Sequence, residues 1–415
     1  MKSSWSDAQA QTFAQRAEAD GYDRQLGLRI YTSQIIGQDP DLVMHGGGNT
    51  SVKVTARDGT RLMHIKGSGW DLGNIEAPGL PAVRLEPLLG IKDGPKLSDP
   101  EMVRALRDAL IDPSAPNPSV EALLHGFIDE AFVDHCHSTA VLALANQTGM
   151  KDRVRALYEG RVAFVPYVMP GFDLSIEGEK IYSRNTGCEG LWLENHGLFT
   201  FGADARTSYE RMIEFVTIAE GELKAHHAGL APAQDTDADA PALLLAGLVE
   251  VLGEYEGPFG AAAAWDFRSN AAIRSYLDLP DLCNIVHRGT ATPDHVIRIK
   301  PFPLIVKPDA DRSEMRTAVD SYRTRYADYF NRNAALADTD KIMLDPLPRV
   351  VLIPGVGLAG IAPDAKAAKI AADLAEQTAR IVLSAERYGR FSPIGEKDLF
   401  DMEYWSLEQA KLSKQ

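Results

Sequence analysis

The chain has 415 residues, of which 45% are hydrophobic and 24% are charged, so it can build a globular core and is neither fibrous nor wholly disordered. Its formal charge is −15, from 43 Lys and Arg against 58 Asp and Glu, and such a surface repels the phosphates of nucleic acids and anionic membranes. At this length two structural units are expected.

No segment predicts export or membrane insertion. The first 21 residues lack the apolar run of a signal peptide, and the most apolar run, 241–253, is about half as long as a membrane helix and contains Glu250. The three cysteines, Cys136, Cys188 and Cys283, form no CxxC pair and are interpreted as reduced thiols. These features predict a cytoplasmic protein.

Hydrophobic periodicity in the first half mixes helices, hairpins and strands. In chain order we expect a helical segment at 11–36, a glycine turn at 46–50, a hairpin of strands 51–54 and 62–65, helices at 99–110 and 118–132, a strand ending in 135–137, a helix at 138–147, an extended segment at 162–167, a hairpin at 191–201 and a helix at 208–227. Asn117 is expected to cap the helix that starts at Pro118. This order favours a layered α/β unit with partly antiparallel strands.

The stretch 229–241 is rich in Ala, Asp and Pro and is the expected linker, so we place two domains at 1–240 and 241–415. No internal repeat is apparent. The later elements, in chain order, are a helix at 271–277, strands at 295–300 and 304–307, a helix at 318–333, a strand at 349–353 and a helix at 365–388.

The run Gly355–Gly360 matches the GxGxxG pattern of dinucleotide sites. Pro363 and Asp364 predict that the following helix begins only after the last glycine. No second strand with a ribose-binding acid is recognised before Gln415, so the βαβ context is missing and no NAD is expected.

Two histidines, His135 and His137, are separated by one residue on an expected strand. Side chains two residues apart leave the same face of a strand, so both imidazoles can bind one divalent ion. His196 lies in an Asn-His-Gly turn between two apolar strands, where a loop residue is held rigidly. The alternative is that these are incidental strand-end and turn histidines.

Glu121 lies near the start of the expected helix 118–132, off its apolar face, with His125 one turn later. One interpretation is a helix-start charge favoured by the helix dipole. The other is a general acid/base beside a metal.

Two glycine turns, 46–50 and 66–70, bracket the first hairpin. Glycines allow consecutive N–H groups to face an anion, and Asn49, Lys66 and Ser68 would add donors and a positive charge for a phosphate. One such turn is more often only a hairpin connection, whereas the pair favours a phosphate site.

Taken together, several motifs resemble the class II aldolase/adducin family in order and spacing. They are GGGNTSVK (46–53), KGSG (66–69), PSVE (118–121), VDHCHSTAVLAL (133–144) and ENHGLFTFG (194–202). Two later motifs, at 289–304 and 396–412, resemble the aldolase half of bacterial rhamnulose-1-phosphate aldolase/short-chain dehydrogenase fusions. The resemblance implies an α/β/α layered fold with a mainly antiparallel central sheet and a C-terminal α/β extension, without the dehydrogenase of the fusions.

The resemblance also implies roles for single residues. The metal-binding histidines are matched by His135, His137 and His196, with Zn²⁺ expected and Mn²⁺ or Co²⁺ suited to the same ligands. Glu121 matches the catalytic glutamate. The positions that cradle a substrate phosphate are Asn49, Ser68, Gly69 and Ser119. Tyr167 resembles a tyrosine that enters a neighbouring subunit's site and protonates the departing aldehyde oxygen.

The implied activity is reversible retro-aldol cleavage of a ketose 1-phosphate, similar to rhamnulose 1-phosphate, to dihydroxyacetone phosphate and an aldehyde. The implied assembly is a homo-oligomer, a tetramer or a multiple of it. One alternative is a pentulose-phosphate 4-epimerase, which shares the fold and metal but resembles this chain less at Glu121. The other is a non-enzymatic adducin-like interaction module, which loss of the metal histidines would mark.

Overall fold

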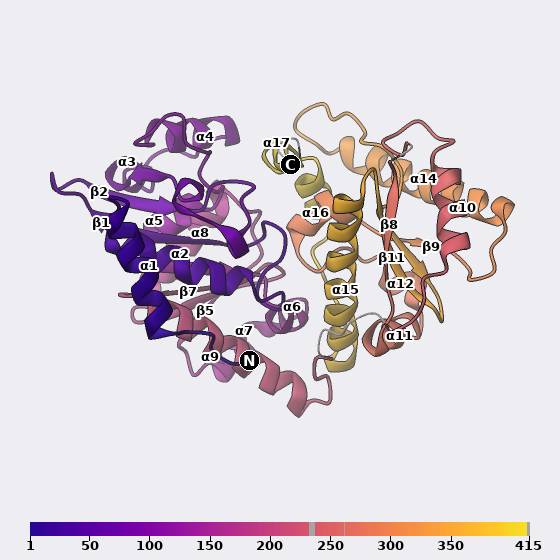
Figure 1. The fold of residues 1–415 in the computed structure, drawn as a ribbon, viewed down its shortest axis with the longest axis horizontal. Helices are drawn as coiled ribbons and strands as arrows, with labels where there is room; N and C mark the ends of the chain where they lie inside the picture. Colours follow the sequence, from indigo (N-terminus) through magenta and orange to yellow (C-terminus); the bar gives the residue numbers. More distant parts are fainter. Residues whose placement is uncertain (232–236, 261, 413–415) are drawn as a thin grey trace. The chain divides into compact units, whose positions relative to one another are not determined.

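The computed structural model describes residues 1–231, 237–260 and 262–412, which divide into two compact units (Figure 1). Unit 1 is Met1–Ala145 with Gly149–Glu222, and unit 2 is Asn146–Thr148 with Leu223–Leu412. The expected domain limit at 240 stays a prediction, and residues 232–236 of the expected linker lie outside the described residues. No helix in the described ranges is long and apolar enough to span a membrane.

Unit 1 alternates helices and strands. Its elements are α1 (Asp7–Ala19), α2 (Arg24–Gly37), β1 (Asn49–Thr55), β2 (Arg61–Ile65), the short 3-10 helices η1 (Leu72–Asn74) and η2 (Ala77–Gly79), β3 (Ala82–Arg84), α3 (Leu85–Leu89), α4 (Asp99–Asp108), α5 (Ala122–Phe127), β4 (Phe132–Cys136), α6 (Thr139–Ala145), α7 (Met150–Leu157), β5 (Val162–Val165), α8 (Phe172–Arg184), β6 (Gly190–Leu193), β7 (Gly197–Gly202) and α9 (Ala205–Ala225).

The strands of unit 1 form a sheet in the order β3-β2-β1-β4-β7-β6-β5, in which only the β5–β6 pair is parallel among the described residues. Side chains alternate between its faces. One face packs against α5 and α8, through Leu124 and Leu174. On the other face Arg29 of α2 and Ser208 of α9 contact Asp134. The α/β/α arrangement and the mainly antiparallel sheet confirm the predicted fold class.

Unit 2 is built from a smaller sheet in the order β8-β11-β10-β9. Its elements are α10 (Ala242–Leu252), β8 (Ala264–Arg268), α11 (Ala271–Leu277), α12 (Leu282–Ile285), η3 (Pro293–His295), α13 (Val296–Ile299), β9 (Leu304–Ile305), α14 (Arg312–Ala334), β10 (Val350–Ile353), β11 (Gly357–Ala362), α15 (Ala365–Tyr388), α16 (Glu396–Glu403) and α17 (Ser406–Leu412).

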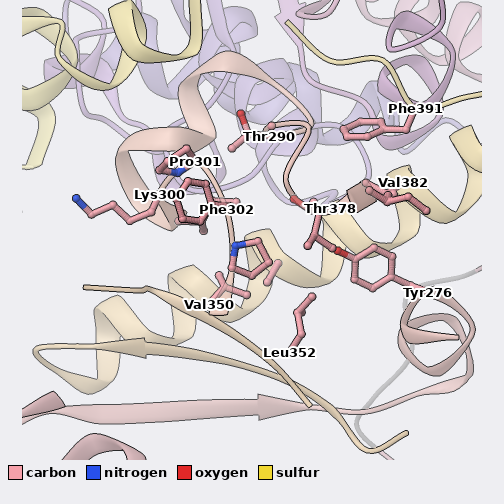
Figure 2. Close-up of a pocket in the computed structure, with 16 residues that line it drawn as sticks. Tyr276, Thr290, Lys300, Pro301, Phe302, Val350, Leu352, Thr378, Val382 and Phe391 are labelled. Atoms are coloured by element: carbon pink, nitrogen blue, oxygen red, sulfur yellow. The ribbon is translucent and has the colours of Figure 1, made fainter. Parts of the chain in front are cut away.

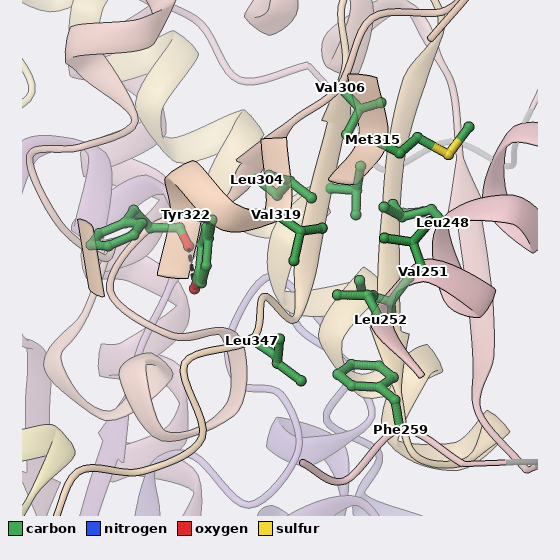
Figure 3. Packing of buried hydrophobic residues seen from close by; sticks show 14 of the residues in the cluster. Leu248, Val251, Leu252, Phe259, Leu304, Val306, Met315, Val319, Tyr322 and Leu347 are labelled. Atoms are coloured by element: carbon green, nitrogen blue, oxygen red, sulfur yellow. Dashed lines mark hydrogen bonds between the residues drawn. The ribbon is translucent and has the colours of Figure 1, made fainter. Parts of the chain in front are cut away.

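The core of unit 2 lies between its sheet and the pair α10 and α14 (Figure 3). Leu248 and Val251 of α10 and Val319 of α14 are fully buried there. On the opposite face α15 packs so closely that a Cβ on Gly360 of β11 would lie within 2.3 Å of the backbone of Ala372. The predicted C-terminal α/β domain is therefore confirmed as a sheet covered on both faces.

Unit 2 repeats the strand order and directions of the second half of unit 1. Strands β8, β11, β10 and β9 are arranged as β4, β7, β6 and β5 are, with two antiparallel pairs followed by a parallel one. The registers equate Gly197 with Gly357 and Cys136 with Arg268. In both hairpins a Cβ on that glycine would strike the carbonyl oxygen of the equivalent strand residue. The sequence keeps only a short trace of this repeat, because Gly197-Leu198 and Asp204-Ala205 recur as Gly357-Leu358 and Asp364-Ala365. The expectation of no internal repeat is therefore wrong.

Most predicted elements are present, but the helix expected at 118–132 is wrong in extent. Helix α5 covers Ala122–Phe127, and its N-cap is Glu121 rather than Asn117. The preceding residues instead pair with the turn at 66–70, since the amide of Ser119 donates to the carbonyl of Lys66 at 3.0 Å. A separate hydrogen-bonding partner for this backbone explains why the helix starts late.

Two further expectations differ from the structure. The strand expected at 295–300 is wrong, because η3 and α13 occupy this stretch. The GxGxxG run forms the turn and second strand of the β10–β11 hairpin rather than the strand-to-helix turn of a dinucleotide site, which agrees with the sequence analysis, where the βαβ context was missing. The helical segment expected at 11–36 is divided into α1 and α2, and α8 is an element that the sequence analysis did not predict.

Candidate metal and catalytic site

Three imidazoles meet at one end of the unit 1 sheet. His135 is in β4, His137 follows that strand, and His196 lies in the β6–β7 turn. Their potential ligand atoms all lie within 4.8 Å of one another, and the Nε2 atoms of His135 and His137 are 3.0 Å apart. All three side chains are buried. The structure thus brings together the three histidines that the sequence analysis singled out.

The backbone beside His135 selects the nitrogen that its ring can offer. Nδ1 of His135 lies 3.2 Å from the carbonyl oxygen of Leu198, which can only accept a hydrogen bond. Nδ1 therefore carries the proton, and Nε2 is the bare nitrogen that faces the other two rings. The His135 ring is further held by stacking on Phe199, with ring centroids 4.3 Å apart.

Two glycines allow neighbouring segments of the chain to approach β4, the strand that carries His135, closely. Gly48 has φ +58°, and a Cβ there would lie 2.5 Å from the carbonyl oxygen of His135. A Cβ on Gly197 would lie 3.1 Å from a ring carbon of His137 and 3.2 Å from one of His135. A side chain at Gly48 would therefore displace the backbone of His135, and one at Gly197 would displace the backbone of Cys136, at 2.4 Å, and crowd the two imidazoles.

Glu121 lies beside this triad. Its carboxylate oxygens are 3.6 Å from Nε2 of His135 and 3.8 Å from Nε2 of His196. The side chain is buried, and Oε2 accepts a hydrogen bond from Nδ2 of Asn49 at 2.6 Å. A buried carboxylate that contacts two imidazoles and one amide is fixed in position, as a general acid/base requires.

The donor set fits a divalent metal ion. In a tetrahedral zinc site, with Zn–N near 2.0–2.1 Å, ligand nitrogens are about 3.3 Å apart. The Nε2 atoms of His135 and His137 are 3.0 Å apart, and the ligand atoms of all three histidines lie within 4.8 Å of one another. The cysteine of the motif is not part of the donor set, because Cys136 leaves the strand on the face opposite to His135. Burial also raises the pKa of the Cys136 thiol to about 12, so this thiol is neutral near pH 7.

Of the residues expected around a phosphate, Asn49 and Ser119 lie beside Glu121, and the others belong to the glycine turn at 66–70. The side chain of Asn49 is turned toward Glu121 and also donates to Oγ of Ser119 at 3.2 Å. The ammonium group of Lys66 donates to the carbonyls of Gly46 and Gly48, so it holds the first glycine turn in place. The 66–70 turn is joined to the 117–119 segment, because the amide of Ser68 donates to the carbonyl of Asn117 at 2.8 Å. In this turn Gly69 has φ +85°.

The last predicted site residue, Tyr167, lies just after β5. Its backbone amide donates to the carboxylate of Glu194 at 3.1 Å, in the residue that follows β6. Its role across a subunit interface stays a prediction.

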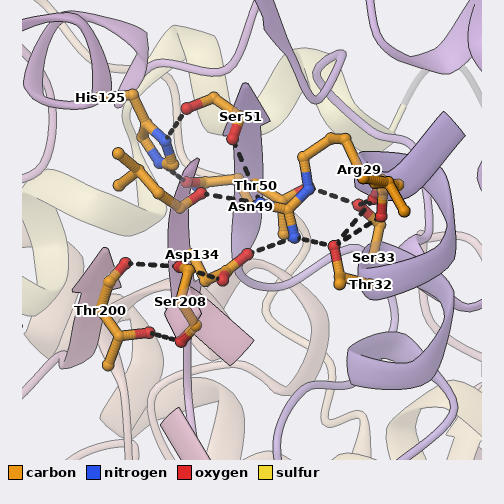
Figure 4. A network of polar contacts seen from close by, with 12 residues as sticks. Arg29, Thr32, Ser33, Asn49, Thr50, Ser51, His125, Asp134, Thr200 and Ser208 are labelled. Carbon is orange, nitrogen blue, oxygen red and sulfur yellow. Dashed lines mark hydrogen bonds and ion pairs between the residues drawn. The ribbon is translucent and has the colours of Figure 1, made fainter. Parts of the chain in front are cut away.

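Sequence inspection missed a polar network on the opposite face of the sheet (Figure 4). Arg29 forms an ion pair with Asp134, and Asp134 also accepts from the hydroxyl of Ser208. Both side chains of the ion pair are fully buried. The sequence does contain one signal for this network, because Asp134 is a charged residue beside His135 in a buried strand. Buried charges of this kind are almost always paired.

In unit 2 the register assigns Phe267, Ser269 and Val356 to the positions of His135, His137 and His196. None of them is a strong metal ligand, and Oγ of Ser269 donates to the carbonyl of Val356 at 2.7 Å. Among the described residues, the triad of unit 1 is the cluster of His, Cys, Asp and Glu suited to a metal ion.

Unit 2 does contain a small cavity with mostly apolar walls, including Ile299, Leu352 and Val382 (Figure 2). Lys300 lines it, but its amino group is turned away from the other labelled residues. That group lies 3.1 Å from the hydroxyl of Tyr326 and 3.5 Å from a carboxylate oxygen of Glu403. Lys300 therefore belongs to a buried polar cluster of unit 2.

Comparisons with known protein families match both halves of the chain. Residues 30–223 match the class II aldolase and adducin N-terminal domain, and residues 238–412 match the second domain of class II aldolases. The chain belongs to the class II aldolase/adducin family.

The chain is also similar to individual proteins of known sequence or structure. A Bacillus subtilis (strain 168) protein named uncharacterized oxidoreductase YuxG is 30% identical over 409 residues, which are 92% of this chain and 58% of that protein. The chain thus spans little more than half the length of that relative. The N-terminal class II aldolase domain of a Thermoplasma acidophilum protein is 35% identical, with a TM-score of 0.47, over 53% of this chain and 98% of that one. L-fuculose-1-phosphate aldolase from Thermus thermophilus is 18% identical, with a TM-score of 0.32, over 48% of this chain and 95% of that one.

Proposed function

We propose that the protein is a metal-dependent aldehyde-lyase that cleaves a ketose 1-phosphate reversibly to dihydroxyacetone phosphate and an aldehyde. The observation that carries this proposal is the position of Glu121, a buried carboxylate 3.6 and 3.8 Å from two imidazoles of a three-histidine cluster. Membership of the class II aldolase/adducin family supports it. The motifs at 289–304 and 396–412 favour a substrate similar to rhamnulose 1-phosphate.

In this proposal the triad holds the metal and Glu121 moves the proton. His135, His137 and His196 would hold a divalent ion, with Zn²⁺ favoured, which would supply polarisation of the carbonyl and adjacent hydroxyl of the sugar. Glu121 accepts or donates the proton at the carbon next to the carbonyl as the carbon–carbon bond breaks or forms. The two glycine turns bind the phosphate through their backbone amides and so orient the substrate.

A retro-aldol screen tests the proposal. The purified, Zn²⁺-loaded protein is incubated with L-rhamnulose, L-fuculose and ribulose 1-phosphates, and dihydroxyacetone phosphate is measured by its reduction with a coupled dehydrogenase. We expect release of dihydroxyacetone phosphate from at least one ketose that the Glu121→Gln variant does not cleave. No release from any of them by metal-loaded protein would refute the assignment.

The same screen separates the two alternatives. An epimerase would convert a pentulose 5-phosphate to its C4 epimer without releasing a three-carbon product, which ¹³C NMR of the sugar detects. A non-enzymatic interaction module would turn over neither class of sugar. The retention of all three histidines and Glu121 around one site favours the enzyme.

We also propose that the active form is a homo-oligomer, a tetramer or a multiple of it, in which Tyr167 of one subunit serves the site of the next. Each of the variants Tyr167→Phe and Glu121→Gln should be inactive alone. Hybrids formed by mixing the two should regain activity, because some sites then combine both intact residues. Inactive hybrids, or an active monomer by light scattering, would show that each subunit holds a complete site.

A further inference from the structure

A chain of buried side chains leads to the carboxylate of Glu121 from the interior of unit 1 (Figure 4 shows its inner part). Oγ of Ser51 lies 2.8 Å from Nδ1 of His125, and Nε2 of His125 contacts Oδ1 of Asn49. Asn49 in turn donates through Nδ2 to Oε2 of Glu121 at 2.6 Å. Every side chain in this chain is less than a tenth exposed, and His125 is fully buried.

Local structure explains why these residues meet. Asn49 and Ser51 are two apart in β1, so they share the face of the sheet that carries His135, the register partner of Asn49. Glu121 and His125 are one helical turn apart, and the amide of His125 donates to the carbonyl of Glu121 at 3.2 Å. The amide of Asn49 therefore fits between a carboxylate and an imidazole that belong to one turn of chain.

The hydrogen-bonding capacity of each group fixes the direction of the chain. Oδ1 of Asn49 can only accept, so Nε2 of His125 must carry a proton. Burial lowers the pKa of His125 well below its usual value, and the nearby cations Lys53 and Arg29 act in the same direction. The ring is therefore neutral, its Nδ1 is bare, and the hydroxyl of Ser51 donates to it.

We propose that His125 is a positioning residue, which holds the amide of Asn49 with its NH₂ group toward Glu121 and thereby keeps the carboxylate in place for proton transfer. With an ionised Glu121, the opposite orientation of the amide would put two acceptor oxygens in contact, and His125 could then no longer donate to Asn49. The orientation seen is the one in which Ser51, His125, Asn49 and the carboxylate each find a partner. The part of this inference that concerns proton transfer rests on the proposed aldolase function.

Its first test needs no substrate. In ¹⁵N-histidine-labelled protein loaded with Zn²⁺, long-range ¹H–¹⁵N spectra should show His125 as the neutral ring with its proton on Nε2, and the variant His125→Phe assigns the signal. In Ser51→Ala the Nε2–H form should persist, because Asn49 still requires it. A proton on Nδ1, or a doubly protonated ring near pH 7.5, would overturn the proposed direction of the chain even if no sugar substrate had been found.

The second test uses cleavage of L-rhamnulose 1-phosphate, or of whichever ketose the screen identifies. His125→Phe keeps the ring volume but removes both nitrogens, so kcat should fall about 10- to 100-fold with unchanged metal content and little change in KM, the usual scale for an outer partner of a site. His125→Gln can present an N–H to Asn49 and should recover part of that loss. His64→Phe, at a half-buried histidine of β2 that contacts the carbonyl of Leu80 instead, is the matched control and should keep the kcat of the unmodified protein.

The pattern across the variants decides between positioning and a purely structural role. Loss of kcat in His125→Phe with partial recovery in His125→Gln supports positioning. Equal losses in both variants, or full activity in both, would overturn it. If no ketose is cleaved even by the unmodified protein, the aldolase proposal fails, while the spectra still establish or overturn the orientation of Asn49.

Discussion

Arg29 and Asp134 form an ion pair from which water is fully excluded, on the face of the sheet directly behind the candidate site. Arg29 also donates to the carbonyl of Ser51 at 3.2 Å, and Ser208 donates to the aspartate. Burial lowers the pKa of Arg29 and raises that of Asp134, whereas the attraction between the two charges acts against both shifts. We take both groups as ionised because each charge has an oppositely charged, hydrogen-bonded partner. The pair therefore fixes α2 and β1 against the strand that carries His135.

Removal of one charge of this pair should destabilise unit 1 strongly. Asp134→Asn and Arg29→Met should each lower the free energy of unfolding by about 3–5 kcal/mol, because the remaining charge of the pair stays buried without an opposite charge. The double variant Arg29→Met/Asp134→Asn should lose less stability than the sum of the two single losses, because the two side chains interact directly. Urea unfolding followed by circular dichroism measures this, and Arg61→Met, at an exposed pair with Glu86, should change stability by less than about 1 kcal/mol. Equal losses at the two pairs would contradict the assignment.

Substitution of the triad should remove the metal. His135→Ala, His137→Ala and His196→Ala should each lose most of the bound ion while the protein stays folded, since a three-nitrogen site cannot keep its affinity with two ligands. Inductively coupled plasma mass spectrometry of the purified variants gives the metal content, with His64→Ala as a control that should keep it. Stoichiometric metal in any of the three would remove that histidine from the ligand set.

Glu121 should matter for turnover rather than for folding. Glu121→Gln should lower kcat by at least about 100-fold, the usual scale for a general acid/base, and should retain metal at least in part. If Glu121 served only as the N-cap of α5, the change would cost about 0.3–1 kcal/mol of stability and little activity. Near-normal turnover in a folded, metal-loaded variant would favour that second interpretation, and Glu86→Gln, at an exposed glutamate, is the matched control.

The sequence predicts the elements of this fold best where periodicity and turn chemistry agree. The hairpin around Asn195 is an example, because apolar strands flank a turn whose asparagine takes φ +54°. Helix 118–132 fails because the backbone of 117–119 hydrogen-bonds to a turn about 50 residues earlier, and such a tertiary partner leaves no periodic signal. The strand expected at 295–300 is wrong for a different reason. Alternating polarity over so few residues does not distinguish a strand from a short helix.

For the site, the sequence identifies the three histidines but not the residues that keep the site's side chains in position. His135 and His137 are recognisable because a spacing of two on a strand is a geometric statement. The role of His125 is not recognisable, because its partners Asn49 and Ser51 are more than 70 residues away in the sequence. They meet His125 only once β1 has paired with β4 and α5 has packed on the sheet. The repeat in unit 2 is hard to recognise for a related reason, because only a few residues, such as Gly357-Leu358 and Asp364-Ala365, repeat those of unit 1, and the strand registers are needed to align them.

Lys53 should make the stability of unit 1 depend on pH in the alkaline range. This lysine of β1 donates to the carbonyl of Glu130 at 2.8 Å, and burial lowers its pKa to about 7, with Arg61 contributing and Asp129 opposing. Between about pH 7 and the ordinary lysine value near 10.4, the unfolded chain binds more protons than the folded one, so stability should rise with pH by at most about 1.4 kcal/mol per unit. Below pH 7 both states carry the proton and this contribution is constant.

Urea unfolding of the unmodified protein and of Lys53→Met at pH 6.5, 7.5, 8.5 and 9.5 isolates the effect, because the variant should lose the rising part of the curve. Lys180→Met, at an exposed lysine of α8, should keep it, and parallel curves for all three proteins would show that Lys53 titrates as an ordinary lysine.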